Sequence, residues 1–230
     1  MDAVKLVLLM RFLRVGPLIA LLFLIPEASS AQQACPQPPA LERVGAKNIF
    51  TDQQEIDLGD AIGDSLARDF VLIDDPALTA HLEELGARLA RYLPPNNLRF
   101  RFFLIDLPEV NAFSLAGGRI YVARKMVALT RSDDELAGVL AHEMGHIVTH
   151  QHSILMTQLL KRVLGVTQVG DRADIYDKFQ RLLENEQRKP TRIRGEGEGD
   201  QYIADQVALF AMARAGFSPK AYVVLWDRFN

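Results

Sequence analysis

Apolar residues recur every three or four positions through most of this chain, which is the spacing of amphipathic helices. Turn and capping residues divide the pattern: Asp75 and Pro76 open one predicted helix, and Gly216 follows the end of another. The pattern predicts helices over residues 51–70, 76–93, 132–148, 154–164, 174–187 and 200–215, a short helix or turn at 125–129, and the start of a further helix at 221–229.

A second pattern, the alternation of apolar and polar residues, covers residues 98–105 and predicts a strand with one buried face. Two shorter strands are predicted at 111–115 and 119–123, with a turn at Gly117 and Gly118 between them. The predicted fold class is therefore α+β and mainly helical, with a small β-sheet. The strands are open to two interpretations: an ordinary structural hairpin, or a strand that lines a cleft and pairs with an extended polypeptide by strand addition.

The composition is typical of a globular domain. The chain has 230 residues, of which 49% are hydrophobic and 24% charged, and its net charge is −3. This slightly acidic balance gives no reason to expect general affinity for nucleic acid or for an anionic membrane. Cys35 is the only cysteine, which excludes an intrachain disulfide and a zinc site built from several cysteines.

The first 31 residues are typical of a signal peptide. Basic residues precede an apolar run at 15–25, and small residues lead to an expected cleavage site after Ala31. An uncleaved membrane anchor is the alternative, although the apolar run is shorter than the roughly 20 residues that span a bilayer. We expect a periplasmic or secreted protein with a flexible lead-in at 32–50 and one domain over 51–230 that is truncated at its C-terminus.

The strongest chemical signal is an HExxH motif formed by His142, Glu143 and His146. Residues four apart share one face of a helix, so the two imidazoles can hold one Zn²⁺, while Glu143 can act as the general base on a water molecule. The helix that carries the motif has a predicted start, because Ser132 and Glu135 have the spacing of a capping box.

A catalytic zinc site usually has three protein ligands, and two schemes supply the third. The first takes His152, which has the metzincin spacing from His142. That scheme needs a turn after the motif, but Thr149 replaces the expected glycine and the helix is predicted to continue, so His150 and His152 are interpreted as surface histidines. The second scheme takes a ligand from the later helix at 200–215.

Four short motifs, taken together, are more specific than HExxH alone. They are Asn111-Ala112-Phe113, the Gly117-Gly118 turn, residues 134–141 leading into HExxH, and Ala204-Asp205 followed by residues 213–217. In combination they resemble the zinc endopeptidases of the CAAX prenyl protease type, which are gluzincins, and in particular their bacterial periplasmic branch of β-barrel-assembly-enhancing proteases. The resemblance covers residues 52–230.

This resemblance implies one Zn²⁺ per chain and a zincin-like domain whose sheet lies beside the HExxH helix. In the family the third ligand is a glutamate four residues before the aspartate of the Ala-Asp pair, but this chain has Gln201 at that position. A glutamine carbonyl brings no charge and is expected to bind zinc more weakly, so Glu198 is an alternative third ligand. Asp205 is implied to accept a hydrogen bond from a ligand histidine.

The resemblance also implies a cleft for a polypeptide substrate in extended conformation. Its predicted substrate-binding residues are Asn111, Gly118, Ile120 and Tyr121. The implied substrates are misfolded or misassembled envelope proteins, and the implied partners are the envelope membrane, as a peripheral association, or its assembly machinery.

The sequence thus predicts a zinc metalloendopeptidase in which Glu143 activates water beside a metal held by His142 and His146. The alternative is a protease-like chaperone or assembly factor that binds polypeptides, because Gln201 weakens the metal site. A membrane-embedded prenyl-protein protease is disfavoured, since no multi-span pattern follows the leader.

Overall fold

The computed structural model describes residues 47–188 and 198–228. The predicted signal peptide, Cys35 and most of the lead-in lie outside these residues. The end of the lead-in is packed against the domain: Phe50 is buried, and the Ile49 backbone N–H donates to Thr157 Oγ1 at 3.2 Å. The packed chain therefore includes the last residues of the lead-in.

The secondary structure confirms a mainly helical α+β domain with a small sheet, and most predicted elements are present. The helices are α1 Asp52–Leu66, α2 Pro76–Ala90, α3 Arg124–Leu129, α4 Asp133–Val148, α5 Gln151–Leu164, α6 Arg172–Arg188, α7 Glu198–Ala215 and α8 Pro219–Asp227. The strands are β1 Val71–Leu72, β2 Arg101–Asp106, β3 Ala112–Leu115 and β4 Arg119–Ala123, with a short 3-10 turn at Ala116–Gly118.

The four strands form one mixed sheet in the order β1-β2-β4-β3. Strand β4 is parallel to β2 and antiparallel to β3, so β4 is paired along both of its edges. Within the part of the chain that the structure describes, β3 is an edge strand, and α4 packs beside it. This order could not be read from the hydrophobic pattern, because alternation reports which face is buried and not which strand is a neighbour.

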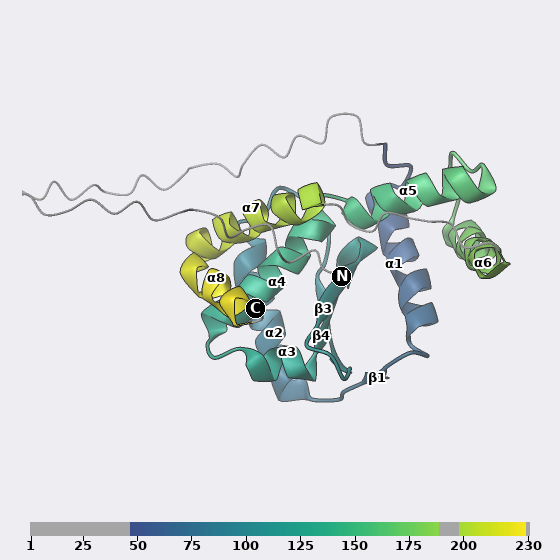
Figure 1. The fold of residues 1–230 in the computed structure, drawn as a ribbon. Helices are drawn as coiled ribbons and strands as arrows, with labels where there is room; N and C mark the ends of the chain where they lie inside the picture. Colours follow the sequence, from purple (N-terminus) through teal and green to yellow (C-terminus); the bar gives the residue numbers. More distant parts are fainter. Residues whose placement is uncertain (1–46, 189–197, 229–230) are drawn as a thin grey trace, which may run out of the picture. The chain divides into compact units, whose positions relative to one another are not determined.

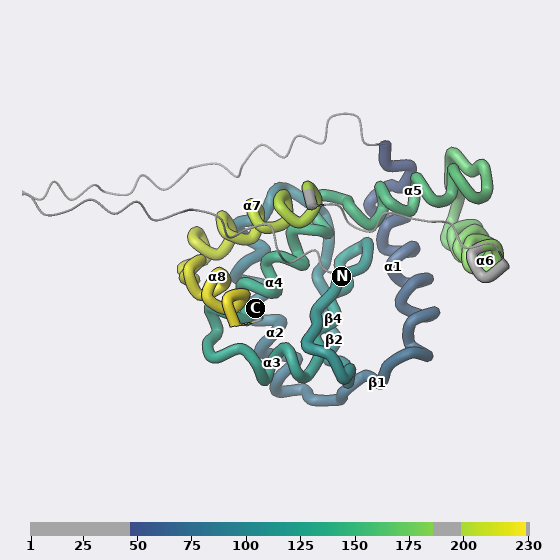
Figure 2. The backbone as a smooth tube through the Cα atoms, viewed as in Figure 1, coloured from purple at the N-terminus to yellow at the C-terminus, as the bar shows by residue number. Residues whose placement is uncertain are grey.

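Helix α4 is the centre of the larger hydrophobic core. Every residue from Glu135 to Val148 is buried, because α2, α7, α8 and β3 all pack against this helix. Figures 1 and 2 show α4 enclosed in this way, while α1 lies on the opposite side of the sheet. The predicted single apolar stripe on α4 therefore underestimates its burial, which extends around the whole helix.

Two glycines permit the close packing of α4. A Cβ atom at Gly138 would lie 2.6 Å from the Tyr222 Cβ on α8, and one at Gly145 would lie 2.8 Å from the Ala204 carbonyl oxygen on α7. Both separations are far below van der Waals contact. The helices that carry the remaining site residues can approach α4 only because these positions have no side chain.

Gly145→Ala is expected to lower the free energy of unfolding by about 1–3 kcal/mol, since α7 must move to accept the methyl group. The measurement is the midpoint of urea unfolding. Gly199→Ala, in the first turn of α7, is the matched control, because within the described residues no atom outside its own helix and chain neighbours lies within 4 Å of its added Cβ. Equal stability of Gly145→Ala and the parent protein would contradict this packing.

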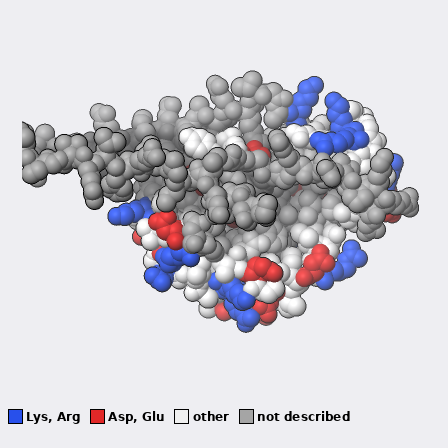
Figure 3. Space-filling model, viewed as in Figure 1, with Lys and Arg blue, Asp and Glu red and all other residues white. Residues whose placement is uncertain are grey.

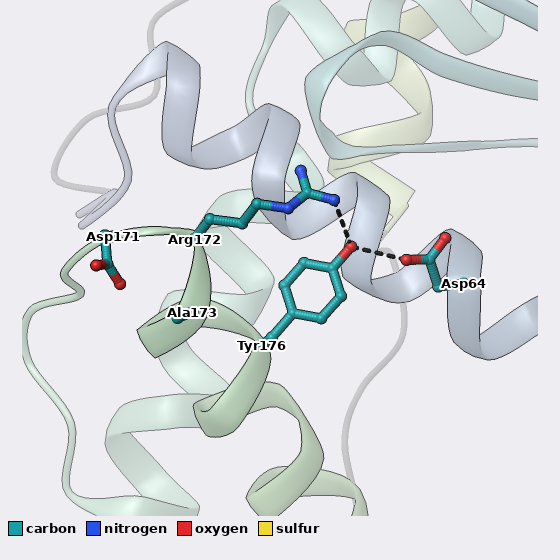
Figure 4. A pocket seen from close by; sticks show the side chains of 5 residues that line it. All are labelled: Asp64, Asp171, Arg172, Ala173 and Tyr176. Atoms are coloured by element: carbon teal, nitrogen blue, oxygen red, sulfur yellow. Dashed lines mark hydrogen bonds between the residues drawn. The ribbon is translucent and has the colours of Figure 1, made fainter.

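A second, smaller core joins α1, α5 and α6, and a hollow of about 550 Å³ opens between α1 and α6. Figure 4 shows its polar side chains meeting at Tyr176: Arg172 Nη2 donates to the Tyr176 hydroxyl at 2.8 Å, and that hydroxyl donates to Asp64 Oδ2 at 2.8 Å. Burial and the Asp64 carboxylate raise the pKa of Tyr176 to about 12. These groups satisfy one another, so we assign no ligand to this hollow.

The charged surface is mixed where the described residues can be seen. Along the lower edge of the face in Figure 3, acidic and basic side chains lie next to each other. Among the described helices, none combines the length and apolar character needed to cross a bilayer.

Candidate metal centre

The start of α4 is stabilised by a hydrogen bond within its first turn and by an ion pair with Arg228, which follows α8. Ser132 Oγ accepts a hydrogen bond from the Glu135 N–H at 3.3 Å, as predicted. The second half of the predicted capping box is absent: Glu135 Oε2 accepts from the Arg131 N–H at 2.8 Å, and Glu135 Oε1 accepts from Arg228 Nη1 at 2.7 Å. The Arg228 guanidinium lowers the pKa of the Glu135 carboxyl, and the ion pair fastens α8 to α4.

The two histidines of the HExxH motif and Gln201 converge on one point. His142 Nε2 lies 3.0 Å from His146 Nε2 and 3.1 Å from Gln201 Oε1. The histidines lie one turn apart on α4, and Gln201 comes from the first turn of α7, which packs across α4. The structure therefore brings Gln201 to the position that the second ligand scheme requires.

The other nitrogen of each imidazole is held by a hydrogen-bond acceptor. His142 Nδ1 lies 2.8 Å from Asp205 Oδ1, and His146 Nδ1 is hydrogen-bonded to Gln151 Oε1. The orientation of the Gln151 amide follows from its other contact, because its Nε2 donates to the Asp200 carbonyl at 2.9 Å. Both Nδ1 atoms then carry a proton, so both Nε2 atoms present lone pairs when the imidazoles are neutral.

The atoms that converge between His142, His146 and Gln201 have the chemistry of metal ligands. In the neutral imidazoles two nitrogen lone pairs and one amide oxygen face the same point, and such acceptors repel one another unless a proton or a metal ion lies between them. Burial lowers the pKa of His142, but the hydrogen bond with Asp205 and the charge of Glu143 raise it more, so the net shift is upward. The arrangement suits a divalent cation with nitrogen and oxygen ligands.

The set is nevertheless unusual for zinc. Within residues 47–188 and 198–228, no three histidine, cysteine or carboxylate groups are arranged to hold a metal ion. The third group here is the neutral amide of Gln201. Glu198, the predicted alternative, begins α7, but its side chain lies outside the described residues.

The predicted continuation of the HExxH helix is wrong. Helix α4 ends at Val148, and His150 adopts a left-handed conformation with φ 55° before α5 starts at Gln151. The side chain of Glu55 holds this break, because its Oε1 lies 2.8 Å from His150 Nδ1. The helix therefore breaks after the motif, without the glycine that the first scheme was expected to need.

This turn corrects the prediction for His152, which lines the same pocket as the HExxH residues and is not a surface histidine. Its Nε2 lies 3.0 Å from Ser114 Oγ, and Ser114 Oγ donates to Glu143 Oε2 at 2.8 Å. His152 is therefore joined to the predicted general base through a serine on β3. It is not grouped with His142 and His146 as a third ligand.

The predicted substrate-binding residues separate into two groups. Asn111 is exposed at the entrance to β3, whereas Gly118, Ile120 and Tyr121 are buried. Ile120 and Tyr121 lie on β4, which is paired on both edges, and the Tyr121 ring stacks between two phenylalanines. All three residues are buried, and Ile120 and Tyr121 lie on a strand that is paired along both edges; their contact with a substrate stays a prediction.

The pocket at the site has a volume of about 220 Å³. Besides the residues already described, Phe113 and Trp226 contribute to its lining, and Tyr222 on α8 donates from its hydroxyl to Asp205 Oδ1 at 2.9 Å. Burial and the Asp205 charge raise the pKa of Tyr222. Sequence reasoning missed Ser114, Gln151, Tyr222 and Trp226, because none of them lies in a motif with diagnostic spacing.

Comparison with known proteins places this site in a family. The model of peptidase family M48 matches residues 76–229. The β-barrel assembly-enhancing protease of Escherichia coli strain K12 is 29% identical over 175 residues, which cover 73% of this chain and 36% of that protein. Its namesake in Yersinia pestis is 27% identical over 93% of this chain and 44% of its own length. The mitochondrial metalloendopeptidase OMA1 of Schizosaccharomyces pombe is 25% identical over 66% of this chain and 44% of its own length. The chain thus spans less than half the length of these relatives.

Proposed function

Because this chain belongs to peptidase family M48, we propose that it is a zinc metalloendopeptidase in which His142, His146 and Gln201 hold the metal. The observation that carries this proposal is the convergence of both Nε2 atoms and the Gln201 oxygen, with Glu143 in the same pocket. A bound zinc ion supplies Lewis-acid polarisation of the scissile carbonyl and makes water more acidic.

The side chains of this chain would transfer the proton and orient the two imidazoles. Glu143 accepts a proton from the attacking water and then donates it to the leaving amine, as a general base and acid. Asp205 and Gln151 hold the two imidazoles so that each presents Nε2 to the metal position. Tyr222 in turn orients Asp205 by donating to its Oδ1.

The substrate would lie along β3 as an added antiparallel strand. The Ala123 N–H donates to the Asn111 carbonyl at 2.9 Å, which identifies this pair as hydrogen-bonded. Since hydrogen-bonded pairs alternate in an antiparallel ladder, the backbone groups of Ala112 and Ser114 point away from β4, toward the open edge. An extended polypeptide could pair with them while one of its peptide bonds reaches Glu143.

The names of the relatives support a proposal for the substrate class and the location. Two of them are named for β-barrel assembly, and a signal peptide at 1–31, as the sequence predicts, would direct the chain out of the cytoplasm. We therefore propose envelope proteins that are misfolded or misassembled as the substrates, in the periplasm and next to the membrane or its assembly machinery.

The test of this function combines elemental analysis with hydrolysis. Purified protein should contain close to one zinc per chain and should degrade unfolded casein. A chelator should remove both the metal and the activity, and added Zn²⁺ should restore them. Folded protein that neither binds zinc nor cleaves casein would reject the peptidase assignment.

Asp205→Ala should weaken zinc binding by about 10- to 100-fold, because His142 loses the acceptor that fixes its tautomer and orientation. Titration against a chelator of known affinity measures the change. Asp205→Asn is the graded control, since its amide oxygen keeps an acceptor without the charge. Unchanged affinity in Asp205→Ala would show that the carboxylate does not support the metal site.

Gln201 favours one alternative function, a polypeptide-binding chaperone or assembly factor that has lost hydrolysis. The same edge strand would hold the polypeptide, but the weak metal site would leave it uncut. Prevention of casein aggregation without cleavage, at a zinc concentration that saturates the site, would support this alternative.

A further inference from the structure

We propose that Ser114 and His152 are positioning residues that hold the carboxylate of Glu143, the general base. This inference rests on the proposed peptidase function. Three side chains from three elements form a continuous hydrogen-bond chain: His152 on α5, Ser114 on β3 and Glu143 on α4. Ser114 and Glu143 are buried, with 4% and 8% of their surface exposed, so water competes little for these bonds.

The direction of each hydrogen bond follows from the groups involved. An ionised carboxylate only accepts, so the single hydroxyl proton of Ser114 is donated to Glu143 Oε2. The Ser114 oxygen can then act only as an acceptor toward His152, whose Nε2 must carry a proton. His152 thereby keeps the serine hydroxyl directed at Glu143, and the serine sets the plane of the carboxylate.

The fold places His152 there through a conformation that is costly for a residue other than glycine. His150 has φ 55° and ψ 27°, and its Nδ1 contacts the buried Glu55 carboxylate from α1. This left-handed residue separates α4 from α5, and His152 in the first turn of α5 lines the pocket. Without the break, His152 would continue along α4 and point away from Glu143.

The link also connects the general base to the strand proposed to hold the substrate. Ser114 contributes its side chain to Glu143 and its outward backbone groups to the open edge of β3. A polypeptide paired with that edge is therefore held on the same residue that orients the base. Such coupling maintains the distance between the scissile peptide and Glu143, which is a geometric requirement for efficient proton transfer.

Ser114→Ala should reduce kcat by about tenfold or more, the order expected for losing one hydrogen bond to a charged group, with KM and zinc content unchanged. Ser114→Thr, which keeps the hydroxyl, should retain most of the activity. His152→Ala should resemble Ser114→Ala, whereas His152→Gln, whose amide can donate, should be partly active. Ser153→Ala is the matched control, because this buried neighbouring hydroxyl has no hydrogen-bond partner among the described residues.

A double-mutant cycle tests whether Ser114 and His152 act through one chain of hydrogen bonds or affect kcat independently. If His152 acts through Ser114, the double variant should be no slower than Ser114→Ala alone. Losses that multiply, or wild-type kcat in Ser114→Ala, would overturn the proposal while leaving the peptidase function intact.

Nuclear magnetic resonance of the histidine side chains tests the same bonds without turnover. In the wild-type protein, His152 should show a proton on Nε2, and Ser114→Ala should shift that signal while Ser153→Ala should not. If the wild-type protein does not hydrolyse casein, the peptidase function is rejected, but the spectrum still tests the hydrogen bond between His152 and Ser114. A His152 signal that is the same in Ser114→Ala and in the wild-type protein would overturn the inference.

Discussion

Glu143→Gln is expected to lower kcat/KM for casein or a peptide substrate by about 10²- to 10⁴-fold, the range attributed to a general base. Glutamine has nearly the same shape as glutamate but cannot accept a proton from water. Its amide oxygen can still accept the hydrogen bond that Ser114 now donates to Oε2 at 2.8 Å, so the surroundings of the site should be preserved. The loss should therefore appear in kcat with little change in stability or zinc content.

The measurement is steady-state hydrolysis with zinc content determined on the same samples. Glu83→Gln, an exposed substitution of the same kind on α2, controls for the change of charge alone. Retained hydrolysis in Glu143→Gln would contradict the assignment of Glu143 as the base. A fall in zinc content would instead indicate that Glu143 supports the metal directly.

Gln201→Glu is expected to raise zinc affinity by at least about 100-fold, more than the change expected for an outer hydrogen-bond partner. The Gln201 oxygen already lies 3.1 Å from His142 Nε2, so a carboxylate of the same length would bring a negative charge to the metal position. Asp205 lies one turn further along α7 and should keep its contact with His142.

Competition with a chelator of known affinity measures this change, and thermal unfolding with and without zinc gives an independent value. Gln201→Asn is the matched control, because its shorter neutral side chain should bind zinc more weakly than the parent. Equal zinc affinity in Gln201→Glu and the parent would show that Gln201 does not occupy the ligand position. Glu198 would then be the candidate for the third metal ligand.

The two variants together also distinguish the two candidate functions. If the parent cleaves casein and Glu143→Gln does not, the amide ligand is sufficient for catalysis. If only Gln201→Glu cleaves, the parent site is competent in every respect except metal affinity, which favours the polypeptide-binding alternative for the natural chain.

Local sequence determined the elements that carry the site. Ser132 starts α4 through a hydrogen bond three residues away, and the spacing of His142 and His146 places both on one helical face. The start of α4 and the spacing of its histidines depend on residues within about one helical turn, where spacing and capping are sufficient. The hydrogen bond between Asp205 and His142, which the structure contains, was implied by the resemblance to the zinc endopeptidases and not by local spacing.

Only the tertiary structure decided how those elements meet. The break at His150 is held by Glu55, which is 95 residues away in the chain, so nothing near Thr149 predicted it. Ser114 acquired its role because strand β3, 29 residues earlier in the chain, places it beside Glu143. Gln151 lies only five residues after His146, and it reaches that imidazole because the break at His150 separates α4 from α5. The same reason applies to the substrate edge. Alternation along a strand identifies its buried face, but long-range pairing alone makes β3 the edge strand and encloses β4 within the sheet.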